Sequence, residues 1–349
     1  MKFRIIVLFT LFTTLTQAQE LESILIAAAG DANDLTERYI NPALKGLVYS
    51  LNNGWANTAK THDKFGFDII IGANLSFVPA NQRNFLFNPS DYKYLALPNG
   101  GTTNLPTVMS EDSNQNVLDV RVPVGDGTFK VASFEMPGGI TKDLPASAVP
   151  SPMIQIGFGL PTRTDIKLRF IPNSDYGDSV KAGMFGIGFQ HDLTQYLGPL
   201  DNLPLSVSGL VAYSNMNVSY FIEDDSDLDD VTVTNGEGEF KLNTFTIEAL
   251  GSLDFKIITL YAAVGYGTGG ASIKLKGDYK LTYDLEDNAG NQIGTVSETV
   301  SNPINIKANN GSLKGTLGAR LNLSIFKIFA NYTLQEYNTF SGGIAFSVR

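Results

Sequence analysis

Residues 312–325, 327–337 and 339–349 alternate apolar and polar side chains over most of their length. This period-two pattern is typical of β-strands with one face in an apolar medium and the other in a polar one. Segments of about ten residues are long enough for a tilted strand to cross a bilayer. Because the last strand would otherwise have an unpaired edge, the pattern predicts a closed sheet.

Upstream segments show the same strand character and raise the number of clear strands to ten. They are predicted at about 65–78, 151–160, 164–171, 180–192, 204–220, 242–254, 257–269, 312–325, 327–337 and 339–349. Short turns alternate with longer polar connections, which in outer-membrane barrels are periplasmic and extracellular, respectively. The fold class is therefore all-β, an antiparallel transmembrane β-barrel with an even number of strands. The long extracellular loops are expected at 79–150, 221–241 and 270–311.

Two of these connections leave the strand number open between ten and fourteen. Nine of the fifteen prolines lie between Pro79 and Pro152, which favours loop because proline donates no hydrogen bond to a sheet. A hairpin is nevertheless compatible with residues 117–124 and 128–136, and a second one with residues 280–300. Each hairpin is either an extracellular extension or two more barrel strands.

The amino-terminal residues 1–18 have the pattern of a cleaved secretory signal. Lys2 and Arg4 precede an apolar run, and small residues end it at Ala18. After Ala18 no apolar run is long enough for a transmembrane helix, so a closed barrel is the remaining way to span a membrane. The rest of the chain is the barrel, 65–349, preceded by segment 19–64.

Segment 19–64 is predicted to be a short helical plug. Asp31 or Asp34 is a candidate cap of a first helix. Asn41 and Pro42 are predicted to end that helix and to start a second one, because proline is favoured at a first helical position. Two such short helices need a partner surface, and we expect them inside or across the periplasmic mouth of the barrel.

The composition is typical of a membrane barrel and limits the kinds of functional site that the chain can form. Charged residues make up 17% of the chain, below the roughly 25% that is usual in soluble domains. The chain has no cysteine, which excludes disulfides and thiolate metal sites. Without Lys2 and Arg4 the net charge is −12, so no nucleic-acid partner is expected.

No enzyme site, metal or cofactor is predicted. His62 and His191 are the only histidines, too few for a zinc cluster in a chain without cysteine. The pairs Gly157/Gly159 and Gly265/Gly267 lie within strands, whereas phosphate-binding glycines lie at a strand-to-helix turn. The acidic run 223–230 lacks the spacing of a calcium loop and is interpreted as a solvated outer loop, with a weak cation site as the alternative.

Charged residues on the inward face of the strands are candidates either to fill the barrel or to line a pore. They are Asp165, Lys167, Arg169, Glu248, Asp254, Lys314 and Arg320. A narrow barrel is filled by its side chains and a wider one leaves a channel, so both interpretations remain open.

The stretch from Gly30 to Leu44, with Asn41, Pro42 and Ala43 before an apolar residue, resembles the plug motif of FadL-type outer-membrane transporters. Those proteins carry fatty acids and other hydrophobic compounds. The resemblance implies a hatch inside the lumen and a barrel of fourteen strands. The whole chain is also similar to outer-membrane barrels of Bacteroidetes-type bacteria, many without an assigned function, which implies the outer membrane of a Gram-negative cell.

The expected function is passive transport of small hydrophobic molecules such as fatty acids, with membrane lipid and those molecules as partners. The alternative is a structural, partner-binding or secretion-associated barrel without transport activity. Ligand pockets are mainly apolar with a few polar anchors, and Arg38 or Lys45 is the candidate partner of a carboxylate. The candidate apolar lining is Leu44, Leu47, Val48, Leu51 and Trp55. The same residues would also serve to pack the plug against the wall.

The alternation in 312–325 predicts which substitutions the barrel tolerates. Leu321→Arg should cost about 2–4 kcal/mol of folding free energy if that residue lies near the bilayer midplane. Asn322→Arg, on the opposite face, should cost less. A folding titration in lipid vesicles measures both, and equal costs would contradict the assigned faces.

Overall fold

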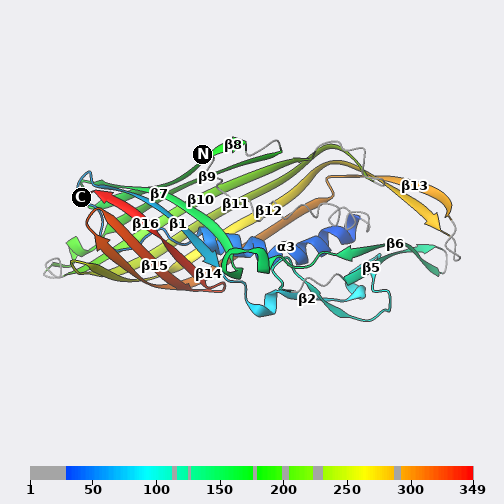
Figure 1. Cartoon of the computed structure of the whole chain (residues 1–349), viewed down its shortest axis with the longest axis horizontal. Coiled ribbons are helices and arrows are strands. Elements are labelled where there is room, and N and C mark those ends of the chain that lie inside the picture. The colour runs from blue at the N-terminus through cyan, green and yellow to red at the C-terminus, as the bar shows by residue number, and fades with distance from the viewer. Residues whose placement is uncertain are drawn as a thin grey trace.

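The computed structural model describes residues 29–111, 116–124, 127–175, 179–198, 204–222, 231–286 and 292–348. Among these residues, ten antiparallel strands pair edge to edge in a closed ring (Figure 1). The ring closes where β1 pairs with β16, from Phe67 opposite Val348 to Ser76 opposite Thr339. The strands of the ring are β1 (Phe67–Ser76), β7 (Val149–Leu160), β8 (Thr164–Asp175), β9 (Val180–Asp192), β10 (Leu205–Ile222), β11 (Val231–Asp254), β12 (Ile258–Glu286), β14 (Ile304–Leu323), β15 (Phe326–Leu334) and β16 (Thr339–Val348).

The prediction of a transmembrane-type antiparallel barrel is confirmed, with the smallest of the expected strand numbers. The two doubtful hairpins lie outside the ring. The first consists of β5 (Asn116–Val124) and β6 (Gly127–Met136). The second consists of β13 (Gln292–Ser301) and residues 278–286 of β12, with which it pairs. The fourteen strands implied by the FadL resemblance are therefore not observed in the described residues.

The barrel has two distinct ends. The turn end carries the short links 161–163, 255–257 and 324–325 and the carboxyl end of β16. The excursion end carries residues 77–148, which connect β1 to β7. Between the two ends the outer face is apolar, as in barrels that cross a bilayer. Exposed outward side chains include Phe158, Phe170, Phe189, Val211, Phe245, Ile247, Val264, Leu317, Leu321, Ile328 and Ile344.

The apolar side of the tall strands β10, β11, β12 and β14 reverses toward the excursion end. In β14, Leu317 is 68% exposed on the outside, whereas Ile306 is fully buried on the inside. In β11 the change falls between the buried Leu242 and the exposed Phe245. The predicted loops 221–241 and 270–311 are therefore largely continued strands in their described parts. The acidic run 223–230 lies outside the described residues.

A single helix, α3 (Ala29–Leu51), replaces the two short helices that were predicted. Pro42 lies inside the helix. Proline removes one backbone hydrogen bond at that point, but Ala43 and Leu44 beside it are buried against the surrounding core, and this packing holds the helix together. The expected helix break is wrong because burial outweighs the local preference of proline.

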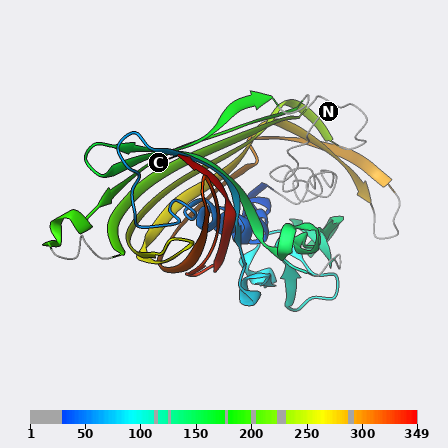
Figure 2. The same cartoon turned by 60° about the vertical axis from the view of Figure 1, so that its left-hand side comes forward.

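The helix lies toward the excursion end and not across the mouth at the turn end, and its second half lies inside the ring, packed against β1, β7, β11, β12 and β14. Figure 2 shows α3 between the tall barrel wall and the strands of the excursion. The excursion forms two small sheets, one from β2 (Asn84–Phe87) and β4 (Thr103–Pro106), the other from β3 (Leu95–Ala96), β5 and β6. We call residues 79–148, with these sheets, the excursion subdomain. No helix in the described residues is both long and apolar enough to cross a bilayer.

Asp31 also has a different role in the structure from the predicted helix cap. Asp31 lies inside the first turn of α3, and its carboxylate accepts hydrogen bonds from the backbone N–H groups of Lys93, Tyr94 and Leu95, at 3.0, 2.6 and 3.2 Å. The aspartate therefore joins the helix to the excursion subdomain. A one-dimensional pattern carries no information about this tertiary partner.

The faces assigned in 312–325 agree with the structure. Leu321 is exposed on the outer face, and Asn322 points inward. Asn322 accepts a hydrogen bond from Arg320 and donates one to Thr259. An arginine at Asn322 would therefore lie beside Arg320, which makes Asn322→Arg less neutral than the alternation alone suggests.

Candidate functional site

The interior of the membrane-facing part of the barrel is occupied by the chain itself. Residues 52–64, here called the lumen segment, follow the end of α3 and lead through the barrel to β1. At the turn end, the backbone N–H of Phe65 donates to the carbonyl of Gly159 in β7 at 2.9 Å. The lumen segment has no regular strand or helix, so its backbone groups need partners from the wall.

The end of α3 is capped by side chains and by the chain that follows it. The last four carbonyl groups of a helix have no partner within the helix. Those of Val48 and Ser50 accept from the backbone of Asn52 and Asn53, and that of Tyr49 accepts from the amide of Asn53. That of Leu51 accepts from Arg169 of β8.

Two buried wall cations face this negative end of the helix. The guanidinium of Arg169 donates to the carbonyls of Leu51 and Asn53 at 3.1 and 2.9 Å, and it stacks 3.9 Å from the ring centroid of Trp55. Lys314 of β14 donates to the carbonyl of Asn52 at 3.0 Å and pairs with Glu248 at 2.5 Å. The positive charges therefore interact favourably with the negative end of the helix dipole and with the carbonyl groups that follow the helix.

Wall glutamines bind the backbone of the lumen segment further along. Gln155 of β7 donates to the carbonyl of Trp55 at 3.3 Å. Gln190 of β9 donates to the carbonyls of Thr58 and Ala59 at 3.0 and 3.1 Å. A buried carbonyl without a partner costs about 1–3 kcal/mol, so this set of wall donors makes the threaded path stable.

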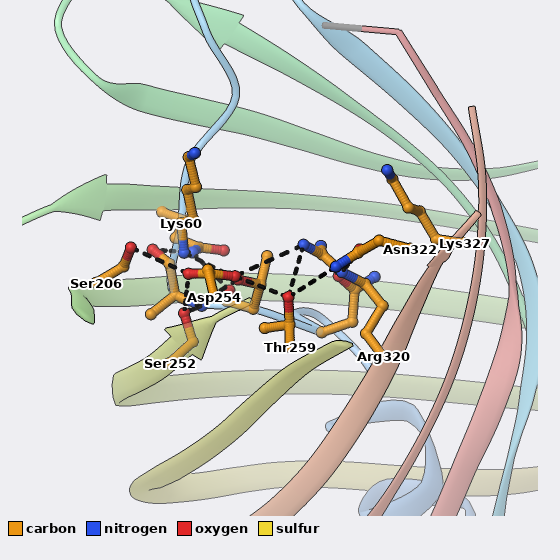
Figure 3. A network of polar contacts seen from close by, with 12 residues as sticks. Lys60, Ser206, Ser252, Asp254, Thr259, Arg320, Asn322 and Lys327 are labelled. Atoms are coloured by element: carbon orange, nitrogen blue, oxygen red, sulfur yellow. Dashed lines mark hydrogen bonds and ion pairs between the residues drawn. The ribbon is translucent and has the colours of Figure 1, made fainter. Parts of the chain in front are cut away.

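A polar network fixes the lumen segment near the turn end, with Asp254 at its centre (Figure 3). The carboxylate of Asp254 accepts hydrogen bonds from Thr58 of the lumen segment at 3.3 Å and from Thr259 of β12 at 2.8 Å. Arg320 of β14 lies 3.9 Å from that carboxylate and donates to the side chain of Asn57 at 2.9 Å. Residues from two wall regions thus meet on the same short stretch of chain.

His62 forms a clamp between two strands. Its Nδ1 lies 2.9 Å from Asp165 of β8, its backbone N–H donates to the same carboxylate at 3.0 Å, and its Nε2 lies 3.5 Å from Asp68 of β1. His62 thus joins β1 and β8 through its side chain and its backbone.

Glycines in the wall provide the room that the lumen segment needs. A Cβ atom on Gly188 would lie 3.0 Å from Cε3 of Trp55, and one on Gly159 would lie 2.7 Å from Cβ of His62. A Cβ on Gly269 would lie 2.9 Å from Cγ1 of Val48. Of the in-strand glycine pairs, Gly157 and Gly159 lie beside His62 and Gly267 lies beside Asn52, whereas Gly265 faces the neighbouring strand.

The predicted ligand-lining residues are buried in the core, and none of them lines the cavity described below. Leu44, Leu47, Val48 and Leu51 belong to one core with the inner wall, and Trp55 belongs to a separate cluster. The Asn41, Pro42 and Ala43 motif lies within α3. Its role as a plug motif and the binding role of the apolar residues stay predictions.

The two predicted carboxylate anchors have partners within the chain. The side chain of Arg38 is about half exposed, lies 3.4 Å from Asp91 and rests over the ring of Tyr92. Lys45 lies 3.6 Å from Glu336, in the link between β15 and β16. The structure therefore does not bring these two cations together with the apolar residues in one cavity.

The structure shows a cavity of about 430 Å³ at the turn end, away from the predicted lining residues. Its wall includes charged side chains from the lumen segment and from the strand ends, among them Lys60, Lys64, Arg163, Asp192 and Asp254. Sequence reasoning missed this polar vestibule and the clamp at His62, because neither shows a local motif. The glycine pairs were the available signal.

Comparisons with known proteins give a family but no activity. The model of DUF6588, described as a family of unknown function, matches residues 1–348. No curated protein sequence matches the chain.

Among solved structures, the chain is similar to three outer-membrane proteins. Ail of Yersinia pestis is 12% identical, with 82% of this chain and 99% of Ail covered and a TM-score of 0.25. The translocator domain of the autotransporter NalP from Neisseria meningitidis is 11% identical, with 82% and 90% covered and a TM-score of 0.26. The toluene transporter TodX of P. putida is 9% identical, with 81% and 89% covered and a TM-score of 0.17. These TM-scores are low, so the fold rests on the strand pairing itself.

The glycine at position 188 provides a test of the threaded path. Gly188→Val should displace Trp55, destabilise the barrel by about 1–3 kcal/mol and shift the emission of this single tryptophan to longer wavelength. Gly251→Val is the matched control, because a Cβ at Gly251 meets no atom within 4 Å. An unchanged emission spectrum in Gly188→Val would contradict the path.

The clamp at His62 predicts a loss of stability when it is removed. His62→Ala takes the imidazole away from the buried carboxylates of Asp68 and Asp165 and should lower the unfolding free energy by about 1–3 kcal/mol. Urea titrations of the barrel in lipid vesicles measure it, and an unfolding free energy equal to that of the wild type would contradict the clamp.

Proposed function

We propose that this chain, which belongs to the DUF6588 family, is an outer-membrane barrel that its own lumen segment keeps closed and whose excursion subdomain binds a protein partner. The apolar outer belt and the contrast between short turns and long excursions support the membrane location, with the excursion end outside the cell. No catalytic role is part of the proposal.

The hydrogen bonding of the lumen segment is the observation that carries the proposal. Arg169, Lys314, Gln155 and Gln190 all bind backbone carbonyls, and these wall side chains are themselves buried or nearly so. Displacing the segment would remove the carbonyl partners of two cations and two amides that are buried in the wall, which is costly. A segment held in this way acts as a fixed part of the barrel.

The excursion subdomain is the structured surface that the closed barrel leaves outside the membrane. Its first sheet exposes Leu86, and its second sheet exposes Val117 and the side chain of Lys130. Its core contains Leu35 and Tyr39 of α3, so the barrel holds the subdomain in a defined position. Exposed apolar and cationic side chains on a rigid support suit the binding of another protein.

Passive transport of small hydrophobic molecules such as fatty acids remains the second candidate. The inner wall beyond the membrane belt is apolar, with Val218, Leu242 and Ile306 buried around α3. Withdrawal of the helix would leave this wall as an apolar groove, with Lys45 available for a carboxylate. Transport in this form requires movement of α3 and of the lumen segment.

An engineered disulfide separates the two candidates. The hydroxyl oxygens of Ser50 in α3 and Ser151 in β7 lie 3.1 Å apart, so Ser50→Cys with Ser151→Cys should form a bond that locks the helix to the wall. The chain has no other cysteine to interfere. The measurement is uptake of a labelled fatty acid into liposomes that contain the wild type, the oxidised or reduced double variant, or Ser50→Cys alone.

A permanently closed barrel should give the same uptake as empty liposomes in every preparation. A transporter should show uptake in the wild type, loss in the oxidised double variant and recovery after reduction. That second result would overturn the closed-barrel proposal and favour the transport candidate.

A further inference from the structure

The first half of α3 is an integral part of the excursion subdomain. Besides the hydrogen bonds of Asp31 to residues 93–95, the side chain of Asn33 accepts from the backbone N–H of Asn305 at 3.0 Å. The backbone carbonyl of Tyr39 accepts from Val108 at 3.0 Å, and its hydroxyl donates to Gly138 at 2.9 Å. The start of the helix is thus fixed at the excursion end.

The core of the subdomain requires this part of the helix. Ala32 and Leu35 are fully buried, and Tyr39 is 7% exposed. They pack in one cluster with subdomain residues Phe87, Tyr92, Leu95, Leu105, Leu118, Val120, Phe134 and Met136. Because the cluster spans both parts, the helix start and the excursion subdomain must lie on the same side of the membrane.

The other end of the same segment lies at the opposite end of the barrel. The side chains of Thr58 and His62 bind residues at the turn end, and β1 begins there at Phe67. Thirteen residues connect Leu51 to Phe65, and an extended chain reaches about 3.3 Å per residue, or roughly 45 Å. That length exceeds the roughly 30 Å of a bilayer core, so the lumen segment is long enough to cross it.

From this threading we propose that the barrel carries its own lumen segment from one side of the membrane to the other and displays the start of α3 on the outer side. The activity is the export of a segment of its own chain. The direction follows from the described contacts of residues 31–39 and 52–65. The inference rests on the proposed outer-membrane location, in which the excursion end is outside.

The glycines and the hydrogen-bond donors of the inner wall are consistent with a chain that passes through the lumen. The wall glycines accept the bulky Trp55 and His62, and the wall cations and amides bind the backbone carbonyls of the segment. A hydrogen bond to a main-chain carbonyl does not depend on which side chain that residue carries. Such a wall suits a chain that passes through the barrel without regular secondary structure.

Two cysteine variants of the same segment test the direction. Asp34→Cys lies on an exposed position of the helix start, and Lys64→Cys on an exposed position at the turn end. The natural chain has no cysteine and serves as the background. Intact cells that produce each full-length variant are treated with a maleimide carried on a polyethylene glycol chain too large to pass a bacterial outer membrane.

We expect Asp34→Cys to be labelled on intact cells and Lys64→Cys to be labelled only after the outer membrane is permeabilised. A peptide tag inserted directly before Ala29 should likewise bind antibody on intact cells. Labelling of Lys64→Cys alone, of both variants, or of neither on intact cells would overturn the inference.

A separate measurement shows which idea fails if the result is negative. Membrane fractionation and the heat-dependent gel mobility of a folded barrel report whether the variants reach the outer membrane. A folded barrel in that membrane with the wrong labelling pattern refutes the threading direction alone. Absence of the wild-type barrel from the outer membrane refutes the proposed function as well.

Discussion

The need to satisfy the backbone of an irregular chain inside a barrel is the constraint on which the rest of the structure depends. Residues 52–64 form neither helix nor strand, so no regular ladder serves their carbonyl groups. The wall provides the donors instead, chiefly Arg169, Lys314 and Gln190. Each donor is long enough to reach the chain from the strand that carries it. The barrel interior is therefore polar because it is a hydrogen-bonding partner for its own chain.

The same constraint explains why the wall combines glycines with long side chains. Where the lumen segment carries a large residue, the wall has glycine, as at Gly188 beside Trp55. Where the segment offers a bare carbonyl, the wall has an arginine, lysine or glutamine. The size of each wall residue thus matches the part of the threaded chain that it faces. This matched arrangement favours a segment that stays in place and disfavours a hatch that opens freely.

Beyond the membrane belt the outer face of the barrel meets water instead of lipid, and the apolar side of the strands changes accordingly. In β11 the apolar face turns from outward at Phe245 to inward at Leu242 within three residues. Outside the belt the exterior meets water, while the interior packs against α3. The upper wall and the excursion subdomain therefore form an ordinary apolar core around a helix. The molecule joins a membrane barrel of polar interior to an extramembrane unit of apolar interior.

The sequence alone determined the barrel. Strict alternation in segments such as 312–325 fixes which side chains face lipid, and the many prolines of 79–150 disfavour sheet pairing over most of that stretch, although Pro150 and Pro152 lie within β7. A reversed alternation is also present in 304–310, within the stretch 270–311 that is predicted as a loop. The existence and order of the ten strands were consequently predictable, whereas β11, β12 and β14 continue well beyond their predicted ends toward the excursion end.

Only the tertiary structure decided what occupies the barrel and at which end α3 lies. The partners of Asp31 and His62 are distant along the chain, at 93–95 and at Asp68 and Asp165, and no local pattern specifies such pairs. Pro42 predicted a break that burial overrides, because the packing of a whole helix outweighs one missing hydrogen bond. The site is thus made of long-range contacts, whose energies depend on distances that a sequence does not contain.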